Sequence, residues 1–357
     1  GRCPSAGRSP GRQVRPAMPV TVDIQGHAMP FSAQTPPADS PAHLQPNRAC
    51  AHRLSRRTLL KGVGGLAAAS VIGGGAVVAG SAPAQAALTV AEHEDHGRMQ
   101  YYKLATSSIG WLPRVNVLLP DGYDTSRRYP VLFLLHGGGE NYSTFDTKYD
   151  IRNHTAGRDL IVVMPDGGAA GWYSDPESSN VGPRNWETFH IKELLPWVDA
   201  TFATTGQASG RAVSGFSMGG FGALKYAAKY PELFASVSSH SGPADLRIQD
   251  GAVVHWANFT AGATDLKGGT IYGIPWDQAR VSADNPVEHV ESYRGKRVFL
   301  VSGTESDRYE SVVLPSQQSF EKALDGAGIG YERYEDTGAH IVRWGRMQQD
   351  IDSLLNH

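Results

Sequence analysis

The group best suited to chemistry in this sequence is a serine framed by glycines, in Gly215-Phe216-Ser217-Met218-Gly219. This G-x-S-x-G pattern follows an apolar run that ends at Phe216 and precedes a helical pattern that begins near Gly219. A strand, a sharp turn and a helix in that order lift the serine hydroxyl above the edge of a sheet. The helix N-terminus beside it favours developing negative charge. The pattern predicts that Ser217 is a nucleophile, and the alternative is a glycine-rich turn without chemistry.

A serine hydroxyl is a weak nucleophile and needs a general base. With this kind of turn the chain order is serine, acid, histidine. Downstream of Ser217 the histidines are His240, His255, His289, His340 and His357. His340 ends a loop of small residues between the last predicted strand and the last predicted helix, where the base belongs. We therefore predict that His340 is the base and that the other four are surface or packing histidines.

The acid that orients the imidazole usually follows the strand before the one that leads to the histidine. That strand is predicted at 298–302, and the loop after it contains Asp307, with Glu305 and Glu310 as neighbours. Asp307 has the short side chain and the loop position expected, so it is the predicted acid. Glu321, on the next predicted helix, is the alternative.

The third requirement is a pair of N–H donors for the oxyanion that forms on the substrate. One is predicted to be the backbone amide of Met218, directly after the nucleophile. The other is predicted in His136-Gly137-Gly138-Gly139, which follows an apolar strand-like run; Gly138 is favoured, with Gly139 next. A flexible glycine turn is the alternative interpretation of this loop. His136 is interpreted as a structural part of it and not as a second base.

Strands that alternate with helices must position these groups. Apolar runs and turn residues predict strands at 115–119, 131–135, 160–164, 212–216, 234–238, 297–302 and 331–334. Helices are predicted at 186–201, 219–230, 315–324 and 341–355. This alternation indicates an α/β fold with a mostly parallel sheet and helices on both faces. The polar, Gly-rich stretch 245–284 is the best candidate for an insertion over the site.

The first 86 residues have a different character. Residues 1–54 are rich in Pro, Ala, Gly and Arg and are predicted to be an unstructured extension. A paired arginine at Arg56-Arg57, an uncharged stretch at 62–80 and a closing Ala84-Gln85-Ala86 predict a twin-arginine signal peptide over 55–86. A retained membrane anchor is the alternative. Residues 87–357 are then predicted to be a single secreted domain without stable membrane insertion.

Composition excludes several classes of protein. The formal net charge of −2 gives no basic face for nucleic acid. Only two cysteines occur, Cys3 and Cys50, which is too few for a disulfide scaffold or a cysteine-rich zinc site. The sequence contains no H-E-x-x-H pattern and no glycine-rich phosphate loop. We therefore expect neither a metal nor a cofactor.

Eight segments together carry a family resemblance: Pro130–Gly137, Val163–Gly168, Trp172–Asp175, Trp186–Phe189, Glu193–Trp197, Gly215–Gly220, Asp284–Pro286 and Gly338–His340. In this order they resemble the esterase D-type family of α/β-hydrolases, which includes the secreted mycolyltransferases of mycobacteria. The resemblance implies an α/β-hydrolase fold, a Ser/acid/His acyl-enzyme mechanism and export. It points to two acids: Glu321 by the mycolyltransferase pattern, and Asp307 by that of feruloyl-type esterases.

The chain departs from the mycolyltransferases in lacking their cysteine pair and in its glycine-rich oxyanion loop, which weakens any expectation of mycolate or trehalose as substrate. We expect a secreted serine carboxylesterase that acts on a small-molecule or lipid ester. The alternatives are an acyltransferase of the mycolyltransferase type, and an inactive secreted binding protein. Acyl and alcohol specificity and the oligomeric state are not predicted.

Overall fold

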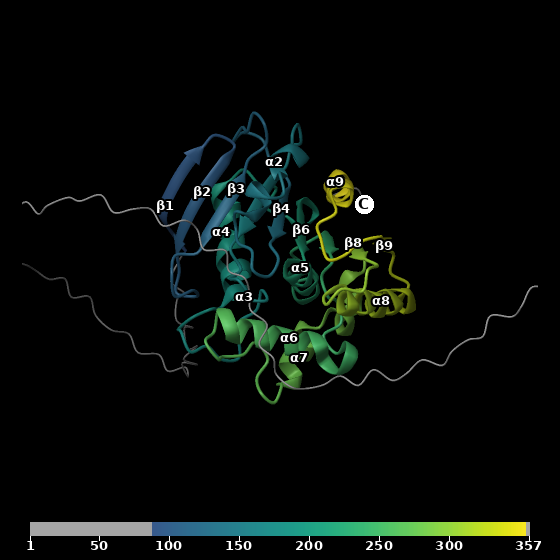
Figure 1. Cartoon of the computed structure of the whole chain (residues 1–357). Coiled ribbons are helices and arrows are strands. Elements are labelled where there is room, and N and C mark those ends of the chain that lie inside the picture. The colour runs from purple at the N-terminus through teal and green to yellow at the C-terminus, as the bar shows by residue number, and fades with distance from the viewer. Residues whose placement is uncertain (1–87, 355–357) are drawn as a thin grey trace, which may run out of the picture. The chain divides into compact units, whose positions relative to one another are not determined.

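A nine-stranded sheet forms the centre of residues 88–354, the part of the chain that the computed structural model describes (Figure 1). Its strand order is β1-β2-β3-β5-β4-β6-β7-β8-β9. The strands are β1 (Thr89–His96), β2 (Met99–Ala105), β3 (Arg114–Leu118), β4 (Val131–Leu135), β5 (Ile161–Pro165), β6 (Arg211–Phe216), β7 (Ser236–His240), β8 (Arg297–Gly303) and β9 (Glu332–Asp336). Every pair from β5 to β9 is parallel, whereas β1, β2 and β3 pair antiparallel.

Helices cover both faces of this sheet. They are α1 (Thr144–Thr147), α2 (Ile151–His154), α3 (Trp186–Thr188), α4 (Leu195–Thr201), α5 (Met218–Lys229), α6 (Ile248–Thr264), α7 (Gln278–Asp284), α8 (Glu310–Ala327) and α9 (Trp344–Ser353). A π-helical segment, Phe189–Leu194, joins α3 to α4, and short 3₁₀ segments occupy Ala208–Gly210 and Pro286–Tyr293. The helices separate into two layers, with α1, α2 and α9 on the smaller core and the others on the larger one.

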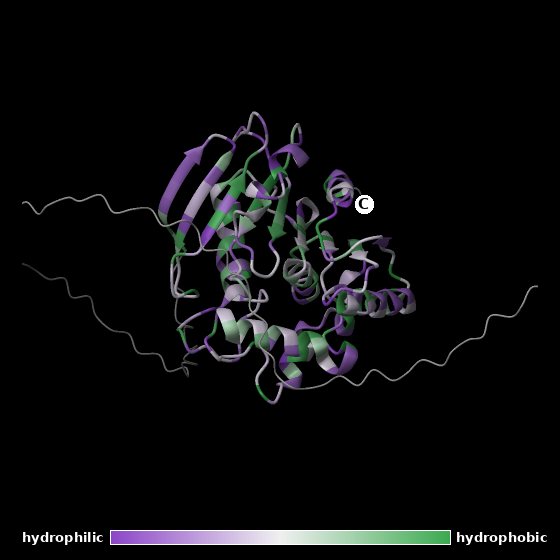
Figure 2. Cartoon of the chain, viewed as in Figure 1, coloured by the Kyte–Doolittle hydropathy of each residue, from purple (hydrophilic) through white to green (hydrophobic). Residues whose placement is uncertain are grey.

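The central strands are apolar because both of their faces are covered. In β4, Phe133 and Leu135 enter one core while Leu132 and Leu134 enter the other, and all are buried. Figure 2 shows the contrast with β1, which is hydrophilic and fully exposed along its length. Continuous apolar runs therefore mark the interior strands of a parallel sheet, and the site lies where these strands end.

The predicted α/β architecture is confirmed, and most predicted elements lie within two residues of the observed ones. Three differences have physical causes. The β1–β2 hairpin was missed because β1 has no buried face and hence no apolar alternation. The stretch 245–284 contains the helices α6 and α7 despite its glycines. The sequence predicts that α8 begins at Pro315, whereas the observed helix begins five residues earlier, at Glu310.

The predicted extension and the predicted signal peptide lie outside the described residues. Within 88–354, no helix is long and apolar enough to cross a membrane.

Candidate active site

Ser217 lies at the sharp turn between β6 and α5, with backbone angles of φ 54° and ψ −118°. A non-glycine residue at positive φ is strained, and such strain is typical of functional turns. The flanking glycines leave room for the turn. A Cβ atom on Gly215 would lie 2.3 Å from the backbone of Gly219, and one on Gly219 would lie 2.1 Å from the carbonyl oxygen of Leu135. The G-x-S-x-G pattern therefore reflects two close backbone approaches.

His340 brings its imidazole to this serine from the far end of the sequence. Its Nε2 lies 2.7 Å from Ser217 Oγ. The ring lies between Phe216 and Tyr309, whose ring centroids are 5.0 and 4.9 Å from its own. Ser217, in the turn after β6, and His340, in the loop between β9 and α9, thus lie in contact.

The carboxylate that faces the other ring nitrogen belongs to Glu310. Its Oε1 lies 3.2 Å from His340 Nδ1, and its side chain is fully buried. Its second oxygen, Oε2, is buried without a hydrogen-bond partner among the described residues. A carboxylate at Nδ1 favours the tautomer that carries its proton there and leaves Nε2 to accept the serine proton. Glu310 is the first residue of α8, so the helix start sets its position.

Asp307, the favoured acid of the sequence analysis, contacts the backbone of the histidine loop and not its ring. Its carboxylate accepts the amide of His340 at 2.8 Å and those of Tyr309 and Glu310 at 2.8 and 2.6 Å. Burial raises the pKa of the Asp307 carboxyl, but these amides and the nearby imidazole outweigh it, so the pKa lies below its ordinary value. Asp307 joins the loop of the base to the start of α8.

Glu321, the alternative acid, forms an ion pair with Arg333. It lies three turns further along α8 than Glu310. The sequence signal for Glu310 is its position three residues after Asp307. A helix predicted to begin at Pro315 leaves Glu310 among the loop carboxylates and does not set it apart from Glu305, whereas the observed α8 begins at Glu310.

The expected oxyanion donors lie on either side of Ser217. The amide of Met218 is at the N-terminus of α5, directly after the nucleophile. The glycine loop after β4 packs against the same turn, since a Cβ atom on Gly137 would lie 3.1 Å from the ring of Phe216. In this loop the backbone amides of Gly137, Gly139 and Glu140 each donate a hydrogen bond. Among the described residues, the amide of Gly138 donates none.

Among the described residues, no other downstream histidine side chain bonds to Ser217, although the backbone carbonyl of His240 accepts the Ser217 amide at 2.8 Å. His240 is buried against Asp350, His289 bonds to the carbonyl of Ser282, and His255 is exposed on α6. His357 lies outside the described residues. No group of three or more His, Cys, Asp or Glu residues within 88–354 is arranged to hold a metal ion.

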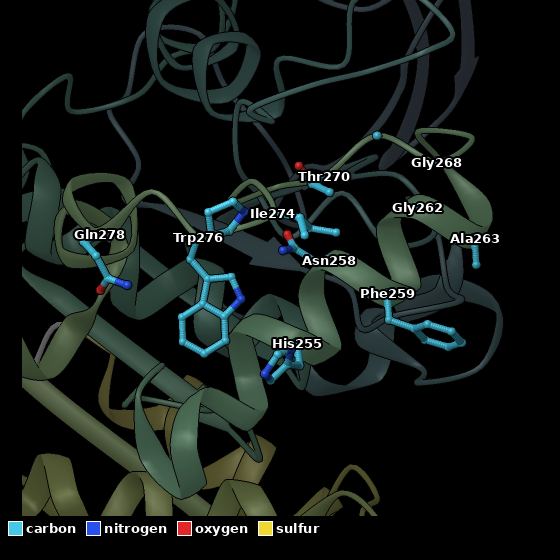
Figure 3. Close-up of a pocket in the computed structure, with 12 residues that line it drawn as sticks. His255, Asn258, Phe259, Gly262, Ala263, Gly268, Thr270, Ile274, Trp276 and Gln278 are labelled. Atoms are coloured by element: carbon cyan, nitrogen blue, oxygen red, sulfur yellow. The ribbon is translucent and has the colours of Figure 1, made fainter. Parts of the chain in front are cut away.

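A groove of about 750 Å³ lies on the outer side of α6 (Figure 3). Its walls include the rings of His255 and Trp276, which meet edge to face with centroids 4.7 Å apart, and the exposed side chains of Phe259 and Ile274. On the inner side of the same helix, Trp256 stacks on Tyr309 at 5.3 Å, next to the imidazole of His340. Helix α6 therefore lies between the apolar groove and the imidazole of His340.

Comparison with known proteins agrees with this geometry. A model of the Esterase family, described as "Putative esterase", matches residues 106–346. The chain belongs to this esterase family. Esterase Rv1288 of Mycobacterium tuberculosis is 58% identical over 277 residues, which are 74% of this chain and 60% of that relative. This esterase chain thus matches only about three fifths of the relative's length.

Two more distant proteins also resemble this chain. The diacylglycerol acyltransferase/mycolyltransferase Ag85B of Mycobacterium leprae is 29% identical over 219 residues, 56% of this chain and 66% of that one. An S-formylglutathione hydrolase from Agrobacterium tumefaciens has the same fold, with a TM-score of 0.59 and 20% identity over 75% of this chain and 97% of its own. The predicted family resemblance and the α/β-hydrolase fold are confirmed.

Proposed function

We propose that this esterase is a serine carboxylesterase that works through an acyl-enzyme. The observation that carries the proposal is the 2.7 Å contact between His340 Nε2 and the hydroxyl of Ser217, a residue held at positive φ. A serine and a base within hydrogen-bond reach, with the base oriented by a third group, is the arrangement that nucleophilic catalysis requires.

The proposed reaction has two halves. Ser217 Oγ attacks the ester carbonyl carbon while His340 Nε2 takes its proton, and the amides of Met218 and Gly138 bind the oxyanion. The tetrahedral species collapses, the C–O bond to the alcohol breaks, and His340 returns the proton to the leaving alkoxide. A water then attacks the acyl-enzyme with His340 again as base, which releases the carboxylic acid and restores the serine hydroxyl.

Within this proposal Glu310 is the carboxylate that holds the imidazole. Its oxygen is 3.2 Å from Nδ1, and its burial keeps water from competing for that nitrogen. Stabilising the imidazolium in the transition state is the role of the acid in such a triad.

Hydrolysis of p-nitrophenyl acetate and butyrate by residues 87–357 tests the proposal. We expect turnover that saturates with substrate, with a burst of p-nitrophenol equal to the enzyme concentration where deacylation is slow. Turnover of both esters no faster than in buffer would contradict the proposal.

Transfer of the acyl group to an alcohol other than water is the second candidate, favoured by the similarity to Ag85B. The acylation half is the same, and only the acceptor differs. Mass analysis of products formed with trehalose or a diacylglycerol present distinguishes the two: hydrolysis gives free acid only, and transfer gives an acylated acceptor.

We also propose export by the twin-arginine route, supported by Arg56-Arg57 and the small residues at 84–86. Replacement of both arginines by lysine is expected to keep the protein inside a bacterial host that exports the unchanged chain. Equal export of both forms would contradict this route.

A further inference from the structure

His136 lies directly after β4, at the start of the glycine loop, and its side chain is almost completely buried. Its Nε2 accepts the backbone amide of Gly167 at 2.9 Å. An imidazole nitrogen that accepts a hydrogen bond carries no proton, so in the neutral ring the proton is on Nδ1. Nδ1 lies 2.8 Å from the carbonyl oxygen of Gly137 and therefore donates to it.

This hydrogen bond fixes one peptide plane. The Gly137 carbonyl and the Gly138 N–H belong to the same peptide unit, and in a planar trans peptide these two groups point in opposite directions. A ring that holds the carbonyl on its own side thus turns the Gly138 N–H away from itself. Gly137 and Gly138 have no side chains that could fix this plane. The Glu140 amide also donates to the Gly137 carbonyl, at 3.2 Å. The imidazole gives the shorter of the two hydrogen bonds that hold this peptide plane, and its removal leaves only the longer one.

The backbone carbonyl of His136 is itself held by a buried tyrosine. The hydroxyl of Tyr173 donates to the carbonyl oxygen of His136 at 2.8 Å. The Tyr173 ring is confined by two glycines, since a Cβ atom on Gly167 or Gly222 would lie 2.7 or 2.6 Å from it. Buried Lys225 of α5 donates to the Tyr173 carbonyl at 2.7 Å. The helix that starts at the nucleophile thus also anchors the loop that carries Gly138.

We infer that His136 is a positioning residue for the oxyanion donor: its Nδ1–H holds the Gly137 carbonyl so that the Gly138 amide faces the reacting carbonyl oxygen. The inference rests on the proposed function. His136 takes no part in proton transfer to substrate, because both ring nitrogens are engaged by the backbone of Gly137 and Gly167.

Three substitutions of His136 distinguish the contributions of its two ring nitrogens. His136→Ala removes both contacts, His136→Asn keeps a donor near the position of Nδ1, and His136→Gln keeps an acceptor near the position of Nε2. For p-nitrophenyl butyrate we expect His136→Ala to lower kcat about 100-fold, the effect of losing one oxyanion donor, with KM changed less than about threefold. His136→Asn is expected to recover most of kcat, and His136→Gln is not.

The affinity of an inhibitor is a readout that a purely structural role of His136 would leave unchanged. An alkyl trifluoromethyl ketone adds to Ser217, and its oxyanion then occupies the same donors as the transition state. Its affinity should fall in His136→Ala by about the same factor as kcat/KM, and recover in His136→Asn. His240→Asn is the matched control, since it also changes a buried histidine; it should lower the melting temperature without weakening the inhibitor.

Two outcomes would overturn the inference: kcat within threefold of wild type in folded His136→Ala, or His136→Asn as impaired as His136→Ala. Failure of the proposed function itself would look different, because Ser217→Ala would then match wild type regardless of His136.

Discussion

Two clusters of serine, histidine and carboxylate each take a serine from β6 or from the turn directly after it, and only one has the geometry of a catalytic site. The first joins Ser217, His340 and Glu310 in line, with the serine on one ring nitrogen and the acid on the other. The second surrounds Asp350, which is completely buried and accepts hydrogen bonds from four side chains. Its donors are Ser214 at 3.0 Å, Ser238 at 2.5 Å, His240 at 2.8 Å and Arg297 at 2.8 Å.

The difference lies in what each nitrogen of the histidine faces. In the second cluster His240 uses Nε2 for Asp350, and its Nδ1 is buried without a partner among the described residues. Ser214 and Ser238 bond to the acid and not to the imidazole. No proton can pass from serine to histidine there. The same three residue types therefore give a site in one place and a structural network in the other.

The largest predicted difference between the two clusters is the effect on kcat of replacing the serine of each by alanine. Ser217→Ala should lower kcat for p-nitrophenyl butyrate by about 10⁴-fold or more, because the nucleophile is lost. Ser214→Ala, three residues earlier on the same strand, should leave kcat within about threefold and cost about 1 kcal/mol of stability. Steady-state kinetics and thermal unfolding of both variants check this. Similar losses of kcat in the two would remove the distinction between the clusters.

The acids come next in expected effect. Glu310→Gln should lower kcat by about 10³- to 10⁴-fold, since the imidazole loses its carboxylate partner. Asp307→Asn should cost about 10- to 100-fold through displacement of the His340 loop, and Glu321→Gln should change kcat less than about threefold. The kcat values of the three variants, measured at one pH, show which carboxylate contributes most to turnover. A larger loss in Asp307→Asn than in Glu310→Gln would make Asp307 the partner of the ring.

Asp350 should matter for stability and not for turnover. Asp350→Asn removes the buried charge partner of Arg297, which keeps only the partly exposed Glu332 at 3.1 Å; breaking a buried ion pair typically costs about 3–5 kcal/mol. Chemical denaturation at pH 7 measures this loss, and kcat per folded molecule should stay within about threefold of wild type. A specific loss of kcat in fully folded Asp350→Asn would give the second cluster a part in catalysis.

The smallest predicted effect is a pH dependence of stability. Burial raises the pKa of Asp350, but His240, Arg297 and Ser238 outweigh it and lower the value to about 2. A carboxyl with a lowered pKa in the folded state stabilises it above the ordinary value near 4, and this is lost as the pH falls toward 2. The contribution is about 2 kcal/mol. The stability difference between wild type and Asp350→Asn should therefore shrink between pH 4 and pH 2; a constant difference would contradict this.

Sequence patterns were most informative where backbone geometry leaves little choice. The glycines beside Ser217 are required because two backbone segments approach each other closely there. The continuous apolar sequence of β4 is required because both faces of that strand are buried. The acid could not be chosen in the same way, because several carboxylates follow β8 and a shift of five residues in the start of α8 decides between them. The role of His136 also depends on hydrogen-bond direction, which spacing does not record.

The most direct test of the central claim is intact-mass analysis after reaction with a fluorophosphonate, which bonds covalently to an activated serine. Wild type and Ser214→Ala should each gain the mass of one phosphonyl group, located at Ser217 by peptide mapping, and Ser217→Ala should gain none. An adduct at another serine, or none on folded wild type, would contradict the assignment of Ser217 as the nucleophile.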